Sequence, residues 1–539
     1  MAIPPQIQMP NAGDRVVNDV AALRSALQAA GFSSVSLHLV GNFVLGDTGP
    51  VVITSATTLW AEEGEATIDA EERSRVLEVQ NSQLLLRNII VTRGRSAGDA
   101  GGCIYAGSSP LSWLGVHGGR VSQCFSGFQF GGGVAQLNGV VQLRDTLLED
   151  CEVRYFGSNS NSMGGGLSVF VGHVLIVNTS FIRCSVVTGT SGTVYGGAVG
   201  LRDAGTISMR DVSFRSCCVQ SDSGDTTGGA LALHGGSVDA DGLSFEECSV
   251  SSGQAISIGG GVGIFAGGMI ARHLSFADTL ASSGTGDFVS GGGIGLRGGQ
   301  LNLTDASFER TRASSGTARA FGGGVGMLSG RVDALRTSFV EASVASNSTL
   351  PNAAFGGAIG MNDGTMIFTH ARLVRSRVQA LNSNGEGGSV GINDGSLALR
   401  NASLIDSYTA SSPSPPAPWA LVLHAPRPAQ LIATLLHVVQ TCSAAEATLP
   451  LVWSGNDGNE MLLRDASFDA ASCTVPIGGS VALASCDAAS SAPWMPSERL
   501  WAWGRLRALE YGPFHTRLRL HGQHLPVAGS GFDRSCSFC

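Results

Sequence analysis

The sequence predicts an all-β solenoid, a right-handed parallel β-helix of about 12 to 14 coils with 30 to 34 residues per coil. Three observations support this fold class. A pair of glycines returns at a nearly fixed interval, a Phe or Leu anchor keeps the same phase, and the apolar residues between them alternate with period 2. Such units bury their apolar face only when they stack on one another.

The glycine pairs mark the start of each repeat. Their first glycines are Gly101, Gly131, Gly164, Gly196, Gly228, Gly259, Gly291, Gly322, Gly356 and Gly387. We interpret the pairs as structural, because glycine permits a left-handed corner and a close approach of neighbouring coils. The pairs on which this interpretation depends most are Gly196 and Gly197, Gly228 and Gly229, Gly259 and Gly260, Gly291 and Gly292, and Gly322 and Gly323.

The anchor residues follow 17 or 18 residues after their own glycine pair. They are Leu148, Phe181, Phe214, Phe245, Phe276, Phe308, Phe339, Leu373 and Leu404. Three short strands fit into each repeat: one after the glycine pair, as in 261–265, one after a central turn, as in 300–303, and one around the anchor. Repeat-equivalent residues should therefore form columns along the stacked coils.

The chain divides into five parts around this repeat. Residues 1–31 form a tail and a capping helix, which begins after Asn18 or Asp19 and stops at Gly31. Opening coils occupy 32–100, and the regular repeats occupy 101–410. Divergent closing coils with a proline-rich loop at 411–418 occupy 411–489. The last part, 490–539, is irregular and includes an expected short amphipathic helix at 496–512.

The composition is that of a folded, turn-rich chain. It contains 75 glycines, 43% hydrophobic and 14% charged residues, which is enough apolar material for a core. The net charge of −9 comes without a basic stripe, so we expect no nucleic-acid partner. No apolar run is long enough for a transmembrane helix, and the first residues lack the apolar core of a signal peptide.

The motif order resembles a known repeat. Gly-Gly followed by Ala and an aliphatic residue, as in Gly196-Gly197-Ala198-Val199, and then a Phe-x-x motif are similar to the repeat of polymorphic outer membrane proteins, a family of surface adhesins. The resemblance covers about residues 100–410 and implies a β-helix of the pectate-lyase-like type. It also implies an extracellular or cell-surface location and a role in adhesion. It transfers no functional residue, because both motifs are structural.

The chain departs from that repeat at the position three residues after the anchor, where the family has Asn. Cysteine replaces it in four successive repeats, at Cys151, Cys184, Cys217 and Cys248, and Thr, Ala or Ser follow later. Stacked residues lie about 4.8 Å apart, which is within disulfide range, but their side chains point the same way. Adjacent disulfides and a column of small buried thiols are both open interpretations, and we favour the thiols.

No catalytic residue and no cofactor are expected. Enzymes that act on polysaccharides also use this fold, but the chain has no Lys and no Asp-Asp pair. Asp363 and Asp394 lie in Asn-Asp-Gly turns, for which a turn role is expected and a shared Ca²⁺ is the alternative. Arg210-Asp211 and Arg464-Asp465 are expected to be outward charged pairs.

Two further patterns carry weaker chemistry. His521, His524, Cys536 and Cys539 have the residue types of a zinc site, and the two cysteines also suit the start of a cysteine-rich extracellular module. Four Asn-x-Ser/Thr sequons are candidates for glycosylation if the chain is secreted. They are at Asn178, Asn302, Asn347 and Asn401.

The segments between an anchor and the next glycine pair vary in sequence. Segments such as 186–195, 282–290 and 344–355 are rich in Ser, Thr and Gly, and they should emerge as loops along one edge. We therefore expect a monomeric, non-enzymatic rod that binds a cell surface, matrix or glycan through these loops. The alternatives are a polysaccharide lyase or glycoside hydrolase, and a structural cell-wall or surface spacer.

Overall fold

The structure is a computed structural model, and it consists of two compact units, residues 1–301 and 302–539. It describes residues 9, 11, 14–62, 66–107, 109–110, 112–157, 161–189, 191–350, 353–382 and 385–411. Beyond these it describes the backbone of 421–425, 430–434, 437–441, 451–455, 460–464, 467–471, 484–485, 501–511 and 515–524. Side chains are described up to residue 409, except at 385–386.

The two units together contain about 11 turns of a parallel β-helix, which confirms the predicted fold class. The first unit opens with the one α-helix of the described chain, α1 (Val20–Ala30). The side chain of Asp19 accepts a hydrogen bond from the Ala22 N–H at 2.7 Å, and Gly31 ends the helix at φ 57°. The predicted capping helix is therefore confirmed, with Leu23, Ala26 and Leu27 buried.

In the first unit, three columns of strands share one large sheet. The strands that follow the glycine pair, with their earlier equivalents, are β4 (Val51–Ile53), β7 (Leu77–Val79), β11 (Ile104–Ala106), β15 (Val134–Gln136), β20 (Leu167–Val169), β24 (Val199–Arg202) and β34 (Ile294–Leu296). The second column contains β1 (Arg15–Val17), β2 (Val35–Leu39), β5 (Thr57–Trp60), β8 (Gln83–Arg87), β12 (Trp113–His117) and β16 (Val140–Arg144). The third contains β3 (Gly41–Val44), β6 (Ala66–Asp69), β9 (Ile89–Thr92), β13 (Arg120–Ser122) and β17 (Leu147–Glu149). A 3-10 turn lies at Gly46–Thr48.

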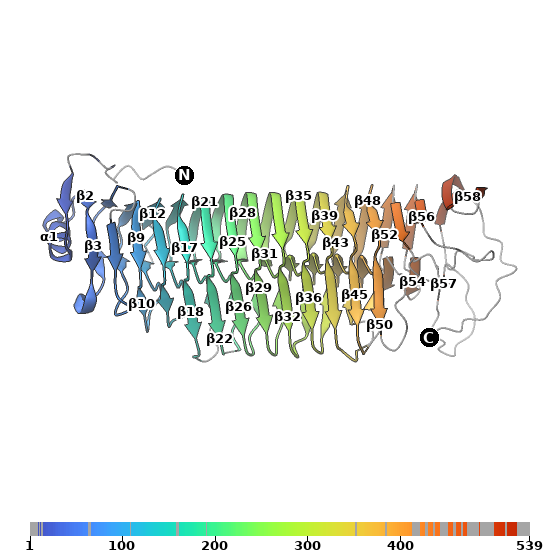
Figure 1. The fold of residues 1–539 in the computed structure, drawn as a ribbon, viewed down its shortest axis with the longest axis horizontal. Coiled ribbons are helices and arrows are strands. Elements are labelled where there is room, and N and C mark those ends of the chain that lie inside the picture. The colour runs from blue at the N-terminus through green and yellow to red at the C-terminus, as the bar shows by residue number, and fades with distance from the viewer. Residues whose placement is uncertain are drawn as a thin grey trace. The chain divides into compact units, whose positions relative to one another are not determined.

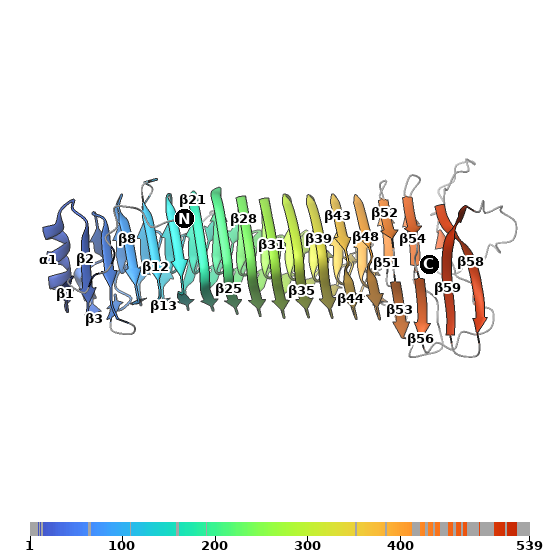
Figure 2. The same ribbon diagram turned by 90° about the horizontal axis from the view of Figure 1, so that it is seen from above.

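Several strands are longer than predicted because they continue around a corner. The strands β21 (Gly172–Ile182) and β25 (Ala204–Arg215) join the second and third columns, and β28 (Leu231–Glu246) and β31 (Val262–Ala277) join all three. Residues with a left-handed backbone, such as Asn178 (φ 46°) and Asp211 (φ 53°), lie within these strands. Figure 2 shows β21, β25, β28 and β31 side by side.

Two more sheets complete the later coils of the first unit. One, which we call the anchor-side sheet, contains β10 (Arg95–Ser96), β14 (Phe125–Ser126), β18 (Glu152–Tyr155), β22 (Ser185–Thr188), β26 (Cys218–Ser221), β29 (Ser249–Ser252) and β32 (Leu280–Ser283). The other, the edge sheet, contains β19 (Ser162–Met163), β23 (Val194–Tyr195), β27 (Thr226–Thr227), β30 (Ser257–Ile258) and β33 (Phe288–Ser290). The pairing between successive coils is parallel (Figure 1).

These sheets correct the prediction that the segments before each glycine pair are loops. Of 186–195, residues up to Thr188 belong to β22 and Val194 and Tyr195 belong to β23, so both ends of the segment are in strands. The same holds for 282–290 and 344–355, which contain parts of two strands each. Strands in these segments pair in parallel with the coils on either side, and this pairing satisfies their backbone N–H and C=O groups. The short Ser- and Thr-rich sequence gives no sign that these strands form.

The second unit repeats this arrangement from Asn302 onward. After β35 (Gln300–Glu309), its large sheet contains β38 (Val325–Met327), β39 (Arg331–Val340), β42 (Ile359–Met361), β43 (Thr365–Thr369), β44 (Arg372–Val374), β47 (Val390–Ile392), β48 (Ser396–Arg400) and β49 (Ser403–Ile405). The anchor-side strands are β36 (Arg312–Ser315), β40 (Ser343–Ser346), β45 (Arg377–Ala380) and β50 (Tyr408–Ser411), and the edge strands are β37 (Arg319–Phe321), β41 (Ala354–Phe355) and β46 (Gly385–Glu386).

Further strands follow in the closing part of the second unit. They are β51 (Leu421–Ala425), β52 (Gln430–Thr434), β53 (His437–Thr441), β54 (Leu451–Gly455), β55 (Glu460–Arg464), β56 (Ser467–Ala471), β57 (Ala484–Ser485), β58 (Trp501–Tyr511) and β59 (His515–His524). The helix expected at 496–512 is wrong, because β58 pairs antiparallel with β59. Trp and Tyr suit a strand, and pairing with a second strand overrides a weak helical pattern. The proline-rich loop lies outside the described residues except for Ser411.

The core consists of columns of like side chains. In the first unit the rings of Phe181, Phe214, Phe245 and Phe276 are stacked, with successive centroids 5.2, 4.9 and 4.6 Å apart. In the second unit Phe308 and Phe339 stack at 4.7 Å. All six anchors are at most 1% exposed. Each aromatic pair contributes about 0.5–1.5 kcal/mol beyond the area that it buries.

Candidate functional site

The glycine pairs are structural, as predicted. All ten glycines named for this role are buried at a corner. At Gly228 the backbone has φ +65°, and at Gly229 an added Cβ would lie 2.1 Å from the Gly260 carbonyl oxygen of the next coil. The first glycine therefore makes the corner and the second permits contact between coils.

The cysteine column contains thiols and no bridge between neighbouring coils. Cys151, Cys184, Cys217 and Cys248 are free and buried, and each Sγ donates to a backbone carbonyl, as from Cys217 to Phe181 O at 3.5 Å. Burial raises the pKa of Cys184, Cys217 and Cys248 well above the usual value. Stacked side chains point the same way, which favours the thiol column over adjacent disulfides.

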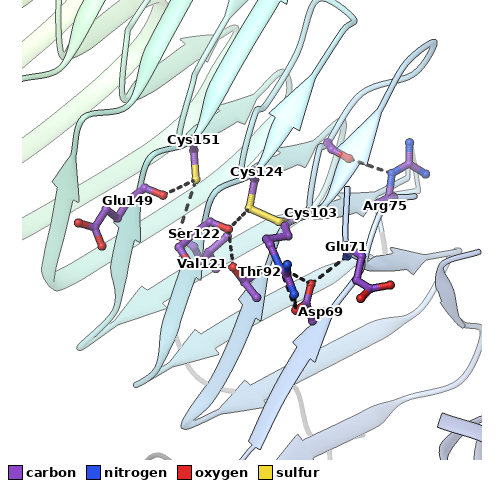
Figure 3. Close-up of a disulfide and its surroundings, with 12 residues drawn as sticks. Asp69, Glu71, Arg75, Thr92, Cys103, Val121, Ser122, Cys124, Glu149 and Cys151 are labelled. Atoms are coloured by element: carbon purple, nitrogen blue, oxygen red, sulfur yellow. Dashed lines mark hydrogen bonds and ion pairs between the residues drawn. A yellow bond between two sulfur atoms is a disulfide. The ribbon is translucent and has the colours of Figure 1, made fainter. Parts of the chain in front are cut away.

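A disulfide does form one coil earlier, where the sequence analysis did not place one. Cys103 follows the glycine pair of its coil, and it is bonded to Cys124, which stands one coil before Cys151 in the same column (Figure 3). Arg75 is buried beside this bond and donates from Nε to Gly101 O at 3.0 Å and from Nη2 to Ala100 O at 2.6 Å. Cys124 lies only 27 residues before Cys151, outside the regular repeat length, so the spacing did not reveal it as a member of the column.

The remaining predicted sites lie on the surface. The four sequon asparagines are exposed, and the side chains of Asn178 and Asn401 contact Asp145 and His370. Asp363 and Asp394 accept hydrogen bonds from the following glycine N–H, as the turn interpretation expects. The described side chains contain no group of three or more His, Cys, Asp or Glu arranged to hold a metal ion.

The structure describes only some of the residues that were predicted to form outward charged pairs or a zinc site. No ion pair joins the described residues Arg210 and Asp211, because the left-handed backbone of Asp211 turns the two side chains apart. In the second unit the equivalent carboxylate, Asp305, pairs with Arg336 at 2.6 Å. Asp465, Cys536 and Cys539 lie outside the described residues, and only the backbone of Arg464, His521 and His524 is described.

A row of aromatic and arginine side chains lies on the outer face of the first unit. We call it the aromatic row. Its members come from the end of each strand that follows a glycine pair and from the neighbouring edge sheet. They are Phe128, Phe130, Phe170, Tyr195, Arg202, His234, Phe265 and Arg297.

Consecutive members of the aromatic row contact one another. Phe130 meets Phe170 edge-on at 4.3 Å, and the Arg202 guanidinium lies 5.6 Å from the centre of the Phe170 ring. Arg202 is the register partner of His234 on the next coil. His234 stacks on Phe265 at 4.4 Å, and Arg297 covers the Phe265 ring at 4.7 Å.

Strand geometry explains why these side chains face outward. Along β24, Val199 and Leu201 point into the core, while Gly200 and Arg202 point out. In each of these coils the residue two positions before the row member also points outward, and it is small. These residues are Ser168, Gly200, Ala232, Gly263 and Gly295. Larger side chains of the edge sheet close over this position, as Met163 and Tyr195 do over Ala232. The row is thus a partly exposed surface on a rigid base.

Two carboxylates are in contact with arginines of the aromatic row, and one of them, Asp203, lies 3.8 Å from Arg202. Asp225, from the turn between β26 and β27, pairs with Arg297 at 2.8 Å. Burial raises the pKa of the Tyr195 hydroxyl, with a smaller opposing contribution from a hydrogen bond with Thr193. The row therefore offers flat apolar faces and two guanidinium groups, and Tyr195, which is 3% exposed, serves as buried support.

No protein-family model, curated protein or solved structure matches this chain. Among the described residues, no helix combines the length and the apolar character needed to cross a bilayer. The fold defines the class of this protein, a parallel β-helix.

Proposed function

We propose that this chain is a non-enzymatic, extracellular or surface-exposed β-helix protein, adhesin-like, which binds a carbohydrate polymer along the aromatic row. The continuous contact of rings and guanidinium groups across five coils carries this proposal. A polymer of repeated sugar units presents apolar C–H faces and hydroxyl groups at regular intervals. Aromatic faces attract polarised C–H groups, and arginine donates to hydroxyl and carboxylate oxygens.

Two further observations support the proposal. The base of the aromatic row is built from paired strands, so the side chains are held in place before the ligand arrives, which lowers the entropic cost of binding. The Cys103–Cys124 disulfide favours an oxidising, extracellular environment. The exposed sequons and the resemblance to surface adhesins point the same way.

The aromatic row favours binding over cleavage. Glycoside hydrolysis uses two carboxyl groups on either side of one bond. Two carboxylates in contact with the row, Asp225 and Asp203, are each paired with one of its arginines, Arg297 and Arg202. We therefore propose recognition without turnover.

Binding of defined polysaccharides tests this proposal. Xylan, pectate, alginate and hyaluronan are titrated into wild type and Phe265→Ala, with calorimetry for affinity and reducing-end assays for cleavage. Phe265→Ala should weaken binding by about tenfold, since one stacked contact contributes about 1.4 kcal/mol. Phe125→Ala is a matched control. The Arg95 guanidinium lies 5.0 Å from the centre of the Phe125 ring, but Phe125 belongs to the anchor-side sheet and not to the aromatic row.

Three outcomes would contradict the proposal. If Phe265→Ala binds as tightly as wild type, and circular dichroism shows that both proteins are folded, the aromatic row is not the binding surface. Binding of none of the four polymers would remove the carbohydrate assignment. Release of reducing ends or unsaturated products would replace the binding function by an enzymatic one.

A further inference from the structure

A second outward-facing group of side chains in the first unit has an unusual charge. Arg87, His117 and Arg144 occupy the last positions of β8, β12 and β16 and are direct register partners on successive coils. We call them the cationic triad. Parallel strands place such partners about 4.8 Å apart. Arg87 and Arg144 lie on either side of His117, so an anion beside the histidine would lie close to two positive charges.

Carboxylates compensate other arginines of this unit but not these. Ion pairs join Arg73 to Asp47, Arg75 to Asp99, Arg93 to Asp69, Arg120 and Arg183 to Glu149, Arg215 to Glu246, and Arg272 to Asp239. Among the described residues, no carboxylate forms an ion pair with Arg87 or Arg144. One acid, Asp145, interacts weakly with His117 and accepts a hydrogen bond from Asn178 at 2.6 Å.

The surroundings hold the cationic triad in place. The buried amide oxygen of Gln142 accepts hydrogen bonds from Arg144 Nη2 at 2.8 Å and Nε at 2.7 Å. The Trp113 ring is only 3% exposed, lies over Gly115 and meets the His117 ring edge-on at 6.4 Å. Partial burial beside an apolar ring lowers the local dielectric, which strengthens attraction for an anion.

We propose that the cationic triad binds a tetrahedral oxyanion, a sulfate or phosphate group. Two guanidinium forks and an imidazole provide donors for several oxygens of one such group. The group is either a free inorganic anion or a sulfate ester on a polymer. This site lies on the second strand of its coils, apart from the strands that carry the aromatic row, so it does not depend on the proposed carbohydrate binding.

Proton uptake at His117 should accompany anion binding. Burial lowers the pKa of His117, and a hydrogen bond with Gln142 opposes this; the charges of Arg144 and Arg87 lower the pKa further, and Asp145 raises it weakly. An anion between the three side chains favours the protonated ring. The anion should therefore bind more tightly at pH 5.5 than at pH 7.5, and His117→Gln should remove most of this dependence.

Thermal shift and calorimetry with sodium sulfate test the site, with sodium chloride at equal ionic strength as reference. Wild type should gain more melting temperature from sulfate than from chloride, and the double variant Arg87→Gln, Arg144→Gln should lose this difference. Arg210→Gln is the control, because Arg210 stands further along the same column and should retain the wild-type response. Both variants remove charge from the surface, and because Arg144→Gln also removes the hydrogen bonds to the buried Gln142 amide, circular dichroism must show that the double variant is folded.

The outcomes distinguish a sulfated polymer from a free anion as the ligand, and they also show when the proposal is wrong. A larger effect of dextran sulfate than of inorganic sulfate, with plain dextran inactive, identifies a sulfated polymer, and equal effects identify the free anion. A sulfate response that is equal in wild type and the double variant reflects general salt stabilisation and overturns the site. A wild-type response no larger than that to chloride overturns it as well.

Discussion

Cys103 and Cys124 are bonded across one corner of a single coil, with their Cα atoms 5.4 Å apart. The corresponding positions of a coil in the second unit are Ser389 and Ser407, whose hydroxyl groups hydrogen-bond to each other. The residue after the glycine pair therefore faces the residue three positions after the anchor. In the intervening coils of the first unit the first position is glycine or alanine, which leaves the cysteine opposite as a free thiol.

Replacement of Ala198 by Cys should therefore create a second disulfide, to Cys217. Ala198 already places a Cβ at the position that Cys103 occupies in its own coil, so the change adds only a sulfur atom. The new bond should stabilise the protein by about 3 kcal/mol, the usual effect for a loop of this length. Non-reducing peptide mapping identifies the bond, and thermal unfolding with and without reductant measures the gain.

The double variant Ala198→Cys, Cys217→Ser is the control for this bond. It keeps the added sulfur and removes its partner, so it should show no bridge and no stabilisation that reductant reverses. A bridge from residue 198 to Cys184 or Cys248 would contradict the within-coil pairing.

The thiols of Cys184, Cys217 and Cys248 should resist alkylation in the native protein. Burial raises the pKa of these thiols, which leaves little thiolate at neutral pH, and a reagent cannot reach them. Iodoacetamide at pH 8 followed by mass spectrometry measures labelling site by site. Cys218 is half-buried and should react first, and all four should react quickly in denaturant. Native labelling of Cys217 as fast as Cys218 would contradict the buried column.

The second glycine of a pair should be far less tolerant of substitution than a glycine elsewhere in the same coils. At Gly229 an added Cβ would lie 2.1 Å from a backbone oxygen, whereas at Gly268 it meets nothing within 4 Å. Gly229→Ala should cost about 3 kcal/mol through overpacking. Gly268→Ala should be neutral or stabilising by about 0.5–1 kcal/mol. Urea unfolding of both variants measures the difference, and similar stabilities would show that coils do not touch at Gly229.

Most of the coil was predictable from the sequence, because its corner and its buried strand are each marked by a residue type that recurs in every repeat. Gly228 marks a corner and Phe245 marks the buried strand, and both signals recur in phase. The two corners that use left-handed residues other than glycine were not predictable. Asn178 and Asp211 suit that conformation, but Arg183 and Ser216 adopt it as well, because pairing with the neighbouring coils fixes the backbone there.

The two surface groups were hidden from sequence reasoning for a different reason. His234 and Phe265 are 31 residues apart, and their sequence positions give no sign that their rings stack. A bulge in the pairing between β28 and β31 shifts the register by one residue, and it brings Phe265 beside His234. Arg87 and Arg144 likewise become neighbours of His117 only once the register is known.

His117 should make stability fall as the pH falls below neutrality. Its pKa in the folded protein lies below the unfolded value of 6.5, since burial and the adjacent arginines disfavour the charged ring. As the pH drops through 6.5, the unfolded chain takes up a proton before the folded chain does, so protonation stabilises the unfolded state. The free energy of unfolding of wild type should therefore be lower at pH 5.5 than at pH 7.5, and part of this loss should disappear in His117→Gln.

Urea unfolding of wild type and His117→Gln at both pH values measures this loss. If His117→Gln loses as much stability as wild type does, the imidazole is not held neutral by its neighbours. Sulfate should reduce the loss in wild type only, because an anion beside Arg87 and Arg144 makes the protonated ring favourable in the folded state.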